Sequence, residues 1–201
     1  MPRTRIVLIA VLPAIAIALS ATAVAPLGPA RFDAQQRLLF PADYREWVFL
    51  SSGQNMTYGP AATAAPKPVF DNVFVNPQAH AEFRKTGRWP DGTMFALEVR
   101  GGQNKGSINK DGSFQAGEPR AVEVHLKDKR FEGGWAFFGF DGDKPAKQIP
   151  TSASCYSCHR DHAAVDTTFV QFYPTLLPIA QEAGTLAPAY VKEEAALAAG
   201  H

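Results

Sequence analysis

Apolar and polar residues alternate along several short stretches of the chain, which predicts β-strands separated by turns. The clearest alternation covers residues 121–127, where three aliphatic side chains fall on one face and Glu123, His125 and Lys127 fall on the other. Branched and aromatic residues bounded by glycine, proline or serine predict further strands. These strands are expected at residues 47–50, 69–75, 93–100 and 134–140.

Helical patterns are confined to a few parts of the chain. Asn76 followed by Pro77 predicts the start of a helix that runs to about Lys85, because asparagine is a favourable N-cap and proline fits the first helical turn. The pattern becomes helical again from Cys155 onward. A short helix is also expected within residues 32–39, and the alanine-rich end at 193–201 predicts a helix or a frayed tail.

Together these elements predict an α+β fold, in which an antiparallel sheet of about five strands packs against helices on one side or at one end. Stretches rich in alanine and proline (58–68) or in glycine and lysine (101–118) are expected to be loops. The chain has 201 residues, 46% of them hydrophobic, which is enough to bury the core of one compact domain.

The N-terminal residues have the pattern of a secretory signal peptide. Two arginines precede an apolar run that ends near Leu19, and Ala21-Thr22-Ala23 fits the cleavage pattern that follows such runs. The apolar run is shorter than the roughly 20 residues that span a bilayer. We therefore expect an exported, periplasmic protein that is not held in a membrane. Its expected parts are a signal peptide at 1–23 and a single domain at 24–201, with a core at about 38–182.

Charge and cysteine content exclude several classes of protein. The chain carries 20 lysines and arginines against 19 aspartates and glutamates, for a formal net charge of +1. Nucleic-acid binders normally show a basic excess, so no nucleic-acid partner is expected. Two cysteines cannot form a disulfide-rich scaffold or a four-cysteine zinc site.

The two cysteines belong to the run Cys155-Tyr156-Ser157-Cys158-His159, which is the C-x-x-C-H signature of c-type haem attachment. Two thiols on one helical turn add to the vinyl groups of the porphyrin, and the histidine that follows binds the iron as its proximal ligand. Export agrees with this interpretation, since c-type haem is attached outside the cytoplasm. We therefore expect one covalently attached haem, close to the C-terminal helices.

Other interpretations of the motif are weaker. A thioredoxin-like pair would follow a βαβ unit, which is not evident before Cys155, and it would leave His159 without a role. A disulfide across two residues would form a tight, strained ring. A zinc site would need two further ligands, and His162 is the only candidate close by.

The sequence offers no strong sixth ligand for the iron. Met56 is expected in a loop and Met94 at the start of a strand, and both precede the motif. His80 and His125 are alternatives, although a single histidine on a helix or strand is more often a polar surface group. A five-coordinate iron with an open distal side is therefore expected.

Several segments in order around C-x-x-C-H resemble the cytochrome P460 family, which includes the β-sheet cytochromes c′. The resemblance covers about residues 38–182. It implies a mainly antiparallel sheet with packed helices, a homodimer, and a five-coordinate c-haem with a capped distal pocket. The segments that carry it are YREWV (44–48), VFVNP (73–77), KTG (85–87), DGT (91–93), GWAFF (134–138) and FVQFYP (169–174).

The resemblance implies binding of nitric oxide or similar nitrogen-oxide ligands. One alternative is the family's hydroxylamine oxidation, with electrons passed to a redox partner protein; another is simple electron transfer. In the enzymes a strand lysine is cross-linked to the haem, and this position falls on Leu97, which has no nucleophilic nitrogen. Whether the chain is an enzyme therefore stays open. Lys85 is a fallback for the cross-link if the register differs.

The resemblance also implies residues on the distal side of the haem. The family's distal carboxylate falls on Glu123, which either points into a pocket as a proton-transfer group with a raised pKa or lies in water on an exposed strand face. Aromatic caps in the cytochrome c′ members exclude larger ligands. The candidates for that cap here are Phe49, Phe74 and Phe95.

Overall fold

A computed structural model describes residues 30–57 and 68–200. The expected signal peptide lies outside the described residues, as does almost all of the loop expected at 58–68. Within the described residues, no helix has both the length and the apolar character needed to cross a membrane.

The described strands form one six-stranded antiparallel sheet, which confirms the α+β prediction. Five strands follow the order β1-β2-β3-β5-β6, and β4 pairs with the end of β3. The strands are β1 (Val48–Gln54), β2 (Val69–Val75), β3 (Met94–Gln103), β4 (Phe114–Gln115), β5 (Ala121–Lys127) and β6 (Trp135–Phe140).

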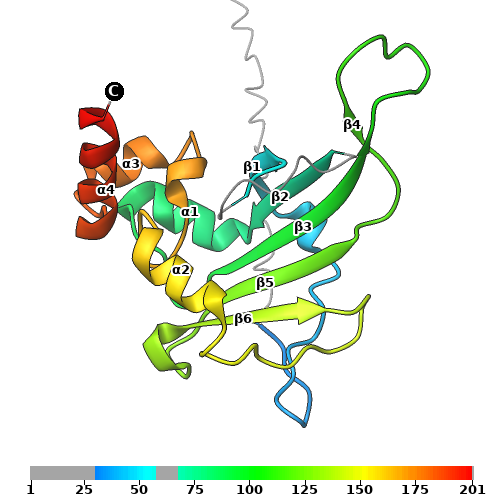
Figure 1. Ribbon diagram of the computed structural model, residues 1–201. Helices are drawn as coiled ribbons and strands as arrows, with labels where there is room; N and C mark the ends of the chain where they lie inside the picture. Colours follow the sequence, from blue (N-terminus) through cyan, green and yellow to red (C-terminus); the bar gives the residue numbers. More distant parts are fainter. Residues whose placement is uncertain (1–29, 58–67, 201) are drawn as a thin grey trace, which may run out of the picture.

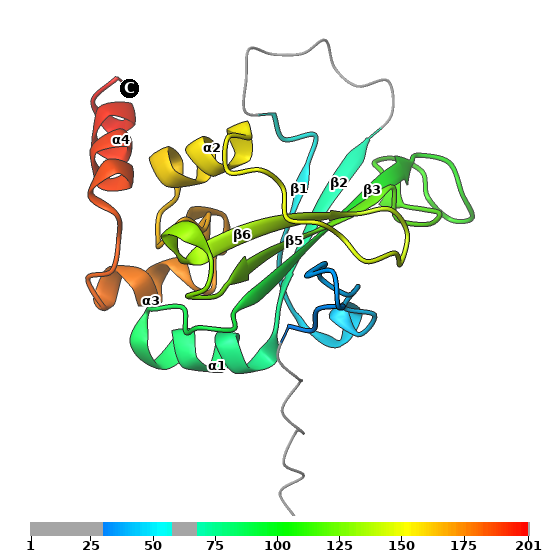
Figure 2. The same cartoon turned by 90° about the horizontal axis from the view of Figure 1, so that it is seen from below.

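The α-helices gather on one face of this sheet, and the segment before β1 lies on the other (Figures 1 and 2). The α-helices are α1 (Pro77–Thr86), α2 (Ser154–His162), α3 (Leu177–Glu182) and α4 (Pro188–Ala199). Short 3-10 turns are η1 (Tyr44–Glu46), η2 (Glu132–Gly134) and η3 (Val170–Phe172).

Some expectations at the level of elements were wrong. Residues 32–39 form a turn closed by a bridge between Phe32 and Leu38 instead of a helix. Residues 51–53, which follow the strand expected at 47–50, are also part of β1, because their backbone pairs with β2. The expected loop at 101–118 contributes the end of β3 and the short strand β4.

Asn76 precedes α1 as expected, but its side chain does not cap that helix. Its Oδ1 accepts a hydrogen bond from the backbone N–H of Met94 at 2.9 Å, and its Nδ2 donates to the carbonyl of Gly92 at 3.2 Å. The side chain therefore joins the end of β2 to the start of β3 and is buried there.

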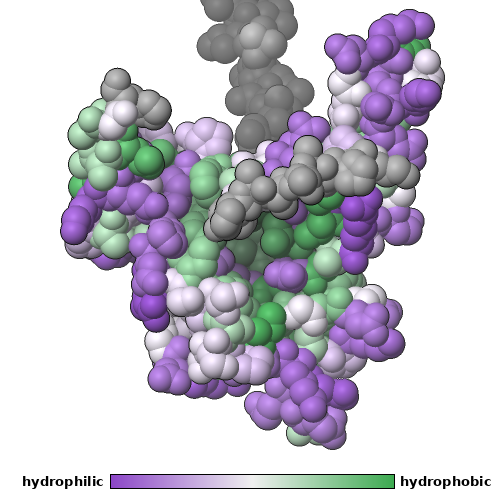
Figure 3. Space-filling view, viewed as in Figure 1, coloured by the Kyte–Doolittle hydropathy of each residue, from purple (hydrophilic) through white to green (hydrophobic). Residues whose placement is uncertain are grey.

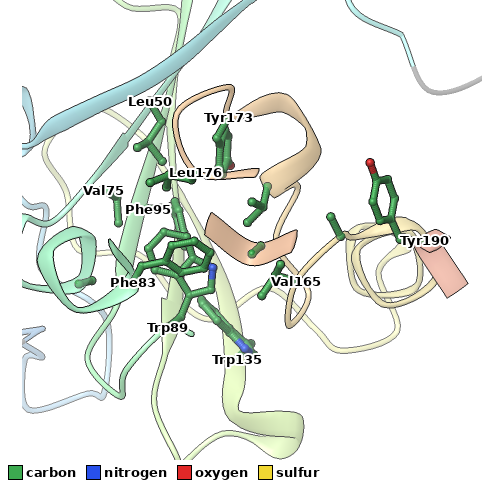
Figure 4. Close-up of a cluster of buried hydrophobic side chains, with 14 residues drawn as sticks. Leu50, Val75, Phe83, Trp89, Phe95, Trp135, Val165, Tyr173, Leu176 and Tyr190 are labelled. Atoms are coloured by element: carbon green, nitrogen blue, oxygen red, sulfur yellow. The ribbon is translucent and has the colours of Figure 1, made fainter. Parts of the chain in front are cut away.

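Two apolar clusters lie on the two faces of the sheet. The cluster under the helices contains Phe83, Trp89, Phe95 and Trp135, together with Tyr190 from α4 (Figure 4). The cluster on the other face contains Leu38, Tyr44, Val124 and Phe138, among others. Because side chains alternate along a strand, β3 and β6 supply both clusters from neighbouring residues.

A buried carboxylate on β3 links the apolar cluster on the face away from the helices, called the second apolar cluster below, to neighbouring strands through hydrogen bonds. Glu98 on β3 is 2% exposed and accepts hydrogen bonds from Tyr44 Oη at 2.5 Å, Asn72 Nδ2 at 3.1 Å and Arg100 Nε at 2.6 Å. Arg45 also forms an ion pair with it. Burial, and next the hydrogen bond to Glu98, raise the pKa of Tyr44 to about 12, so its hydroxyl stays a donor.

Candidate haem site

Helix α2 presents the motif residues on one side. Cys155, Cys158 and His159 are spaced i, i+3 and i+4, so their side chains share one helical face, and all three line the same pocket. Both cysteines are free thiols. Burial is the main cause of a raised pKa for the Cys155 thiol, which keeps that thiol protonated.

Tyr156, between the two cysteines, attaches α2 to the sheet. Its hydroxyl donates to the carbonyl of Ile149 at 3.0 Å and accepts from the backbone N–H of Phe137 on β6 at 3.3 Å. Its ring meets that of Phe137 edge-on, with centroids 4.8 Å apart. A variable position of the motif therefore sets the distance between α2 and β6.

The His159 ring is oriented by a backbone group. Its Nδ1 lies 2.7 Å from the carbonyl oxygen of Thr167, and only a protonated Nδ1 can donate to that oxygen. Nε2 then carries the lone pair and is available to bind a metal. Burial lowers the pKa of His159, which also favours the neutral ring.

The Thr167 carbonyl is presented by a tight turn. Asp166 and Thr167 have φ of 45° and 60°, values that residues with a side chain seldom adopt. Contacts to the sheet hold this turn: the Asp166 carboxylate accepts from Trp135 Nε1 at 3.2 Å and forms an ion pair with Lys127. The strain is thus sustained by β5 and β6, as is common at functional sites.

Three rings surround the His159 imidazole. The ring of Phe169 lies 4.2 Å away, that of Phe137 4.7 Å and that of His125 4.9 Å, between centroids. Together with the Thr167 carbonyl they leave the imidazole little freedom to rotate.

A pocket of about 550 Å³ separates α2 from the sheet. This volume lies within the roughly 300–1,000 Å³ typical of small-molecule and cofactor sites. Apolar side chains gather in a hollow between the helices and the sheet (Figure 3). Besides the motif residues, the lining includes Ser51, Gly53, Met56, Asp71, Val73, Phe95, Leu97, Glu123, Val124, His125, Phe137, Ser154, Thr168, Phe169, Phe172 and Tyr173.

Three of the residues expected on the distal side lie in this pocket. Leu97 and Glu123 are direct partners on β3 and β5, and Phe95 precedes them on the same face of β3. Of the two settings considered for Glu123, the structure has the pocket wall, and the side chain is exposed there.

Two of the proposed aromatic caps lie elsewhere. Phe49 and Phe74 pair across β1 and β2 on the opposite face of the sheet, with ring centroids 5.6 Å apart. Phe74 packs against the second apolar cluster, and Phe49 is 55% exposed. The register of β2 causes this, because Phe74 is one residue away from the pocket-lining Val73.

The other candidate ligands are also separated by the fold. Met94 is buried in the second apolar cluster, whereas Met56 lines the pocket beside Gly53. His80 lies on α1 and is not part of the pocket lining. The Lys85 side chain is 72% exposed, pairs with Glu82 and does not line the pocket either.

His125 corrects the expectation of a polar surface group. It is 8% exposed, its ring stacks on Phe137 at 4.0 Å, and burial lowers its pKa well below the usual value for histidine. Its Nε2 is buried without a hydrogen-bond partner. This nitrogen is covered by neighbouring side chains, since the rings of Trp135, Phe137 and His159 surround the imidazole.

Sequence reasoning missed two features of the site. The Thr167 carbonyl carries no side-chain signal, so its role depends on the turn that places it against His159. Asp71 on β2 lines the pocket as a second carboxylate. It stands in the sequence Val69–Val75 as one acidic residue in an otherwise branched and aromatic strand, which was a usable signal.

The residues present fit a haem. Two thiols and an imidazole with a free Nε2 lie along one wall of an apolar pocket of suitable size. Among the described residues, no group of three or more His, Cys, Asp or Glu side chains could hold a metal ion by itself. The iron would therefore depend on the porphyrin for its other ligands.

Comparison with protein families supports the same assignment. The family model described as cytochrome P460 matches residues 41–170, more than half of the chain. The matched region includes Leu97, Glu123 and the whole C-x-x-C-H motif. A search of curated proteins finds no match.

Proposed function

The chain belongs to the cytochrome P460 family and is a haem cytochrome of that family. From this premise we propose that it is an exported monohaem protein that binds nitric oxide or similar nitrogen-oxide ligands. Cys155 and Cys158 attach one c-type haem through thioether bonds. His159 is the single axial protein ligand. The observation that carries the proposal is the His159 imidazole, whose Nδ1 is held by the Thr167 carbonyl at 2.7 Å, leaving Nε2 for iron.

The chain's own residues supply binding, orientation and shielding. Thr167 sets the tautomer of His159, and Phe137 and Phe169 restrict its rotation. Leu97 and Phe95 make the opposite wall apolar, which favours small uncharged ligands over bulk water. A bound haem iron supplies the coordination site for a diatomic ligand. Glu123 lines the same pocket, and burial followed by repulsion from Asp71 raises its pKa, which suits proton exchange with such a ligand.

The alternative of hydroxylamine oxidation has less support. It depends on a lysine cross-link, and the position that the family resemblance assigns to that lysine is Leu97, which lines the pocket. No lysine is present among the described residues that line the pocket. Simple electron transfer calls for a second axial ligand, and Met56 is the side chain best placed to provide one.

The proposal is tested on the protein produced in a bacterial host that exports it and attaches c-type haem. We expect an alkaline pyridine spectrum of haem c at one haem per chain, and a high-spin, five-coordinate spectrum that changes on adding nitric oxide. Cys155→Ala and Cys158→Ala should each remove one thioether bond, with Ser157→Ala as the control. A protein without covalent haem would contradict the proposal.

The same sample tests the alternatives. A low-spin spectrum that becomes high-spin in Met56→Leu would assign Met56 as sixth ligand and favour electron transfer. A ferrous Soret band near the 460 nm of the family name would indicate a haem cross-link and favour hydroxylamine oxidation, with transfer of electrons to a redox partner protein.

We also propose export to the periplasm and a homodimer. Export is supported by the signal pattern at 1–23, and the dimer by family membership alone. Intact mass should show a chain that begins after Ala23. Sedimentation equilibrium should give twice the mass of one chain, and a monomer at micromolar concentration would contradict the dimer.

A further inference from the structure

We propose that Asp166 is a positioning residue for the axial ligand of the iron, because it holds the Thr167 carbonyl against His159. This contact sets how strongly the imidazole donates electrons to the iron. The inference rests on the proposed function, since it requires His159 to be the axial ligand. The term proximal clamp refers below to the side chains that hold residues 165–168, which are those of Trp89, Lys127, Trp135, Asp166 and Thr168.

The clamped segment is a tight turn whose sequence does not favour it. Val165 and Thr168 exchange backbone hydrogen bonds of 2.8 and 3.2 Å, and both residues between them have positive φ. Positive φ at both central positions is characteristic of type I′ turns, which strongly prefer glycine at the second of them. Thr167, with φ of 60°, stands at that second position, where a β-branched residue is unusual. The surrounding structure must therefore stabilise the turn.

The sheet holds the turn through the Asp166 carboxylate. One oxygen accepts a hydrogen bond from Trp135 Nε1 at 3.2 Å, and the other pairs with Lys127 Nζ. Lys127 and Trp135 are direct partners across β5 and β6. The same ammonium donates to the carbonyl of Trp89 at 2.9 Å, which fixes its own position. Because each carboxylate oxygen has a separate partner, both the place and the orientation of Asp166 are set.

A second anchor lies on the other side of Thr167. The Thr168 hydroxyl accepts a hydrogen bond from Trp89 Nε1 at 2.9 Å and donates to the carbonyl of Val165 at 2.6 Å. Thr168 and Trp89 are both buried, and both tryptophans of the proximal clamp lie in the cluster under the helices (Figure 4). The Thr167 hydroxyl has no hydrogen-bond partner within the described part of the chain, so the neighbours of Thr167 hold the turn.

The position of this carbonyl affects the chemistry of the axial ligand. His159 Nδ1 lies 2.7 Å from the Thr167 oxygen. A hydrogen bond from Nδ1 raises the basicity of Nε2, so the imidazole binds iron more strongly and stabilises the ferric over the ferrous state. If an anchor is lost, the strained turn can relax and the carbonyl can move away from His159. The iron–histidine bond then weakens and the reduction potential rises.

A direct effect of charge is the alternative explanation, and Lys127 separates the two. Removal of its positive charge, acting through space alone, would favour ferric iron and lower the reduction potential. Loosening of the proximal clamp would raise the reduction potential instead. Trp135→Phe changes no charge, so any effect of that variant comes from the lost hydrogen bond to Asp166 and not from electrostatics.

The test uses the haem-loaded protein. Resonance Raman spectroscopy gives the iron–histidine stretching frequency of the ferrous state, and spectroelectrochemical titration gives the reduction potential. We expect Trp135→Phe and Lys127→Met each to lower that frequency. The ratio of ferrous to ferric protein at a fixed potential should rise by about tenfold, which is about 59 mV for a one-electron couple. Asp166→Ala loses both contacts and should give the largest change, and Asp166→Asn serves if that variant fails to fold.

Matched controls remove the same groups elsewhere. Trp47→Phe removes an equally buried indole N–H, which bonds to Asp43 at 3.4 Å on the other face of the sheet. Lys144→Met removes a lysine from its exposed pair with Asp141. Both controls should keep the iron–histidine frequency and the reduction potential of the wild type.

An unchanged frequency in Trp135→Phe and Lys127→Met would overturn the proximal clamp, as would a lower reduction potential in Lys127→Met. An equal change in Trp47→Phe would also overturn it, because the effect would then come from general loss of packing. These results would leave the proposed function intact, since haem content is measured on the same samples. A wild-type protein without haem would instead contradict the proposed function.

Discussion

At the scale of single residues, the buried Glu98 carboxylate is the most constrained charge of the sheet. Two arginines, one tyrosine and one asparagine contact it on the face of β3 opposite Leu97. Removing one partner of a buried ion pair leaves the other uncompensated, and this generally costs about 3–5 kcal/mol. Arg45 is half exposed, so water compensates part of that loss at this site.

We expect Glu98→Gln to lower the free energy of unfolding by about 2–3 kcal/mol, because Arg45 and Arg100 lose their shared counter-charge. Tyr44→Phe removes one hydrogen bond and should cost about 1–2 kcal/mol. Urea denaturation of the haem-loaded protein measures both. Glu46→Gln, at an exposed position of η1, is the control and should stay within about 0.5 kcal/mol of the wild type. If Glu98→Gln has the same free energy of unfolding as the control, the Glu98 carboxylate does not stabilise the fold.

Residue spacing predicted the haem ligands, but it did not predict what orients them. Cys155, Cys158 and His159 stand in a contiguous motif, so their type and order were readable. The Thr167 carbonyl is a backbone atom in a strained turn, and its approach to His159 depends on Asp166 being held by β5 and β6. Such a contact has no local pattern in the chain.

At the scale of elements, the motif helix α2 is supported by the C-terminal helix α4. The two helices are in contact, and Tyr190 of α4 is buried in the cluster under the helices. The backbone N–H of Ala187, just before α4, donates to the carbonyl of Ala164, just after α2, at 2.8 Å. The alanine-rich end of the chain, expected as a helix or a frayed tail, is helical through Ala199, although its side chains from Val191 onward are exposed and only Tyr190 anchors the helix.

Replacement of Tyr190 by alanine should lower the free energy of unfolding by about 2–4 kcal/mol, since a buried aromatic side chain is lost and leaves a cavity. Hydrogen exchange should also become faster in α2. Val191→Ala, one residue further on and 49% exposed, should change the stability by less than about 0.5 kcal/mol. If Tyr190→Ala destabilises the protein but hydrogen exchange in α2 is not faster, then α4 stabilises the fold without supporting α2.

Strand positions were predicted more accurately than their extents. The alternation at 121–127 and the branched run at 69–75 coincide with β5 and β2. The ends of β1 and β3 extend into residues expected as turn or loop, where serine and glycine pair through their backbones with β2 and β4. Local propensity does not include such pairing, because its hydrogen bonds come from another strand.

At the scale of the whole molecule, the sheet separates a cluster that supplies Phe95 and Tyr173 to the pocket from one that reaches the pocket only through Val124. Phe83 contacts Trp89 at 4.0 Å, and Trp89 contacts the pocket-lining Phe95 at 4.8 Å, between ring centroids. Phe138, equally buried, packs on the other face of the sheet. The two phenylalanines thus form a matched pair for separating stability from function.

We expect Phe83→Ala and Phe138→Ala to lower the free energy of unfolding by similar amounts, about 3–5 kcal/mol, because each leaves a cavity in a packed cluster. Only Phe83→Ala should change the kinetics of carbon monoxide binding to the ferrous haem, since its cavity lets Trp89 and Phe95 move. Guanidinium denaturation and flash photolysis measure the two effects. Equal changes in ligand kinetics would contradict the separation of the clusters by the sheet. Smaller Phe→Leu changes at both positions serve if either alanine variant fails to fold.

The sequence by itself determined the α+β fold class, most of the strands, the family, and the C-x-x-C-H motif from which haem attachment is predicted. All of these depend on contiguous patterns, which a linear chain displays directly. The tertiary structure alone decided that Phe95 lines the pocket while Phe49 and Phe74 do not, that His125 is buried, and that Asp71 joins Glu123. Those outcomes depend on strand register and on which face of the sheet the helices cover, and both are set by contacts between residues far apart in the chain.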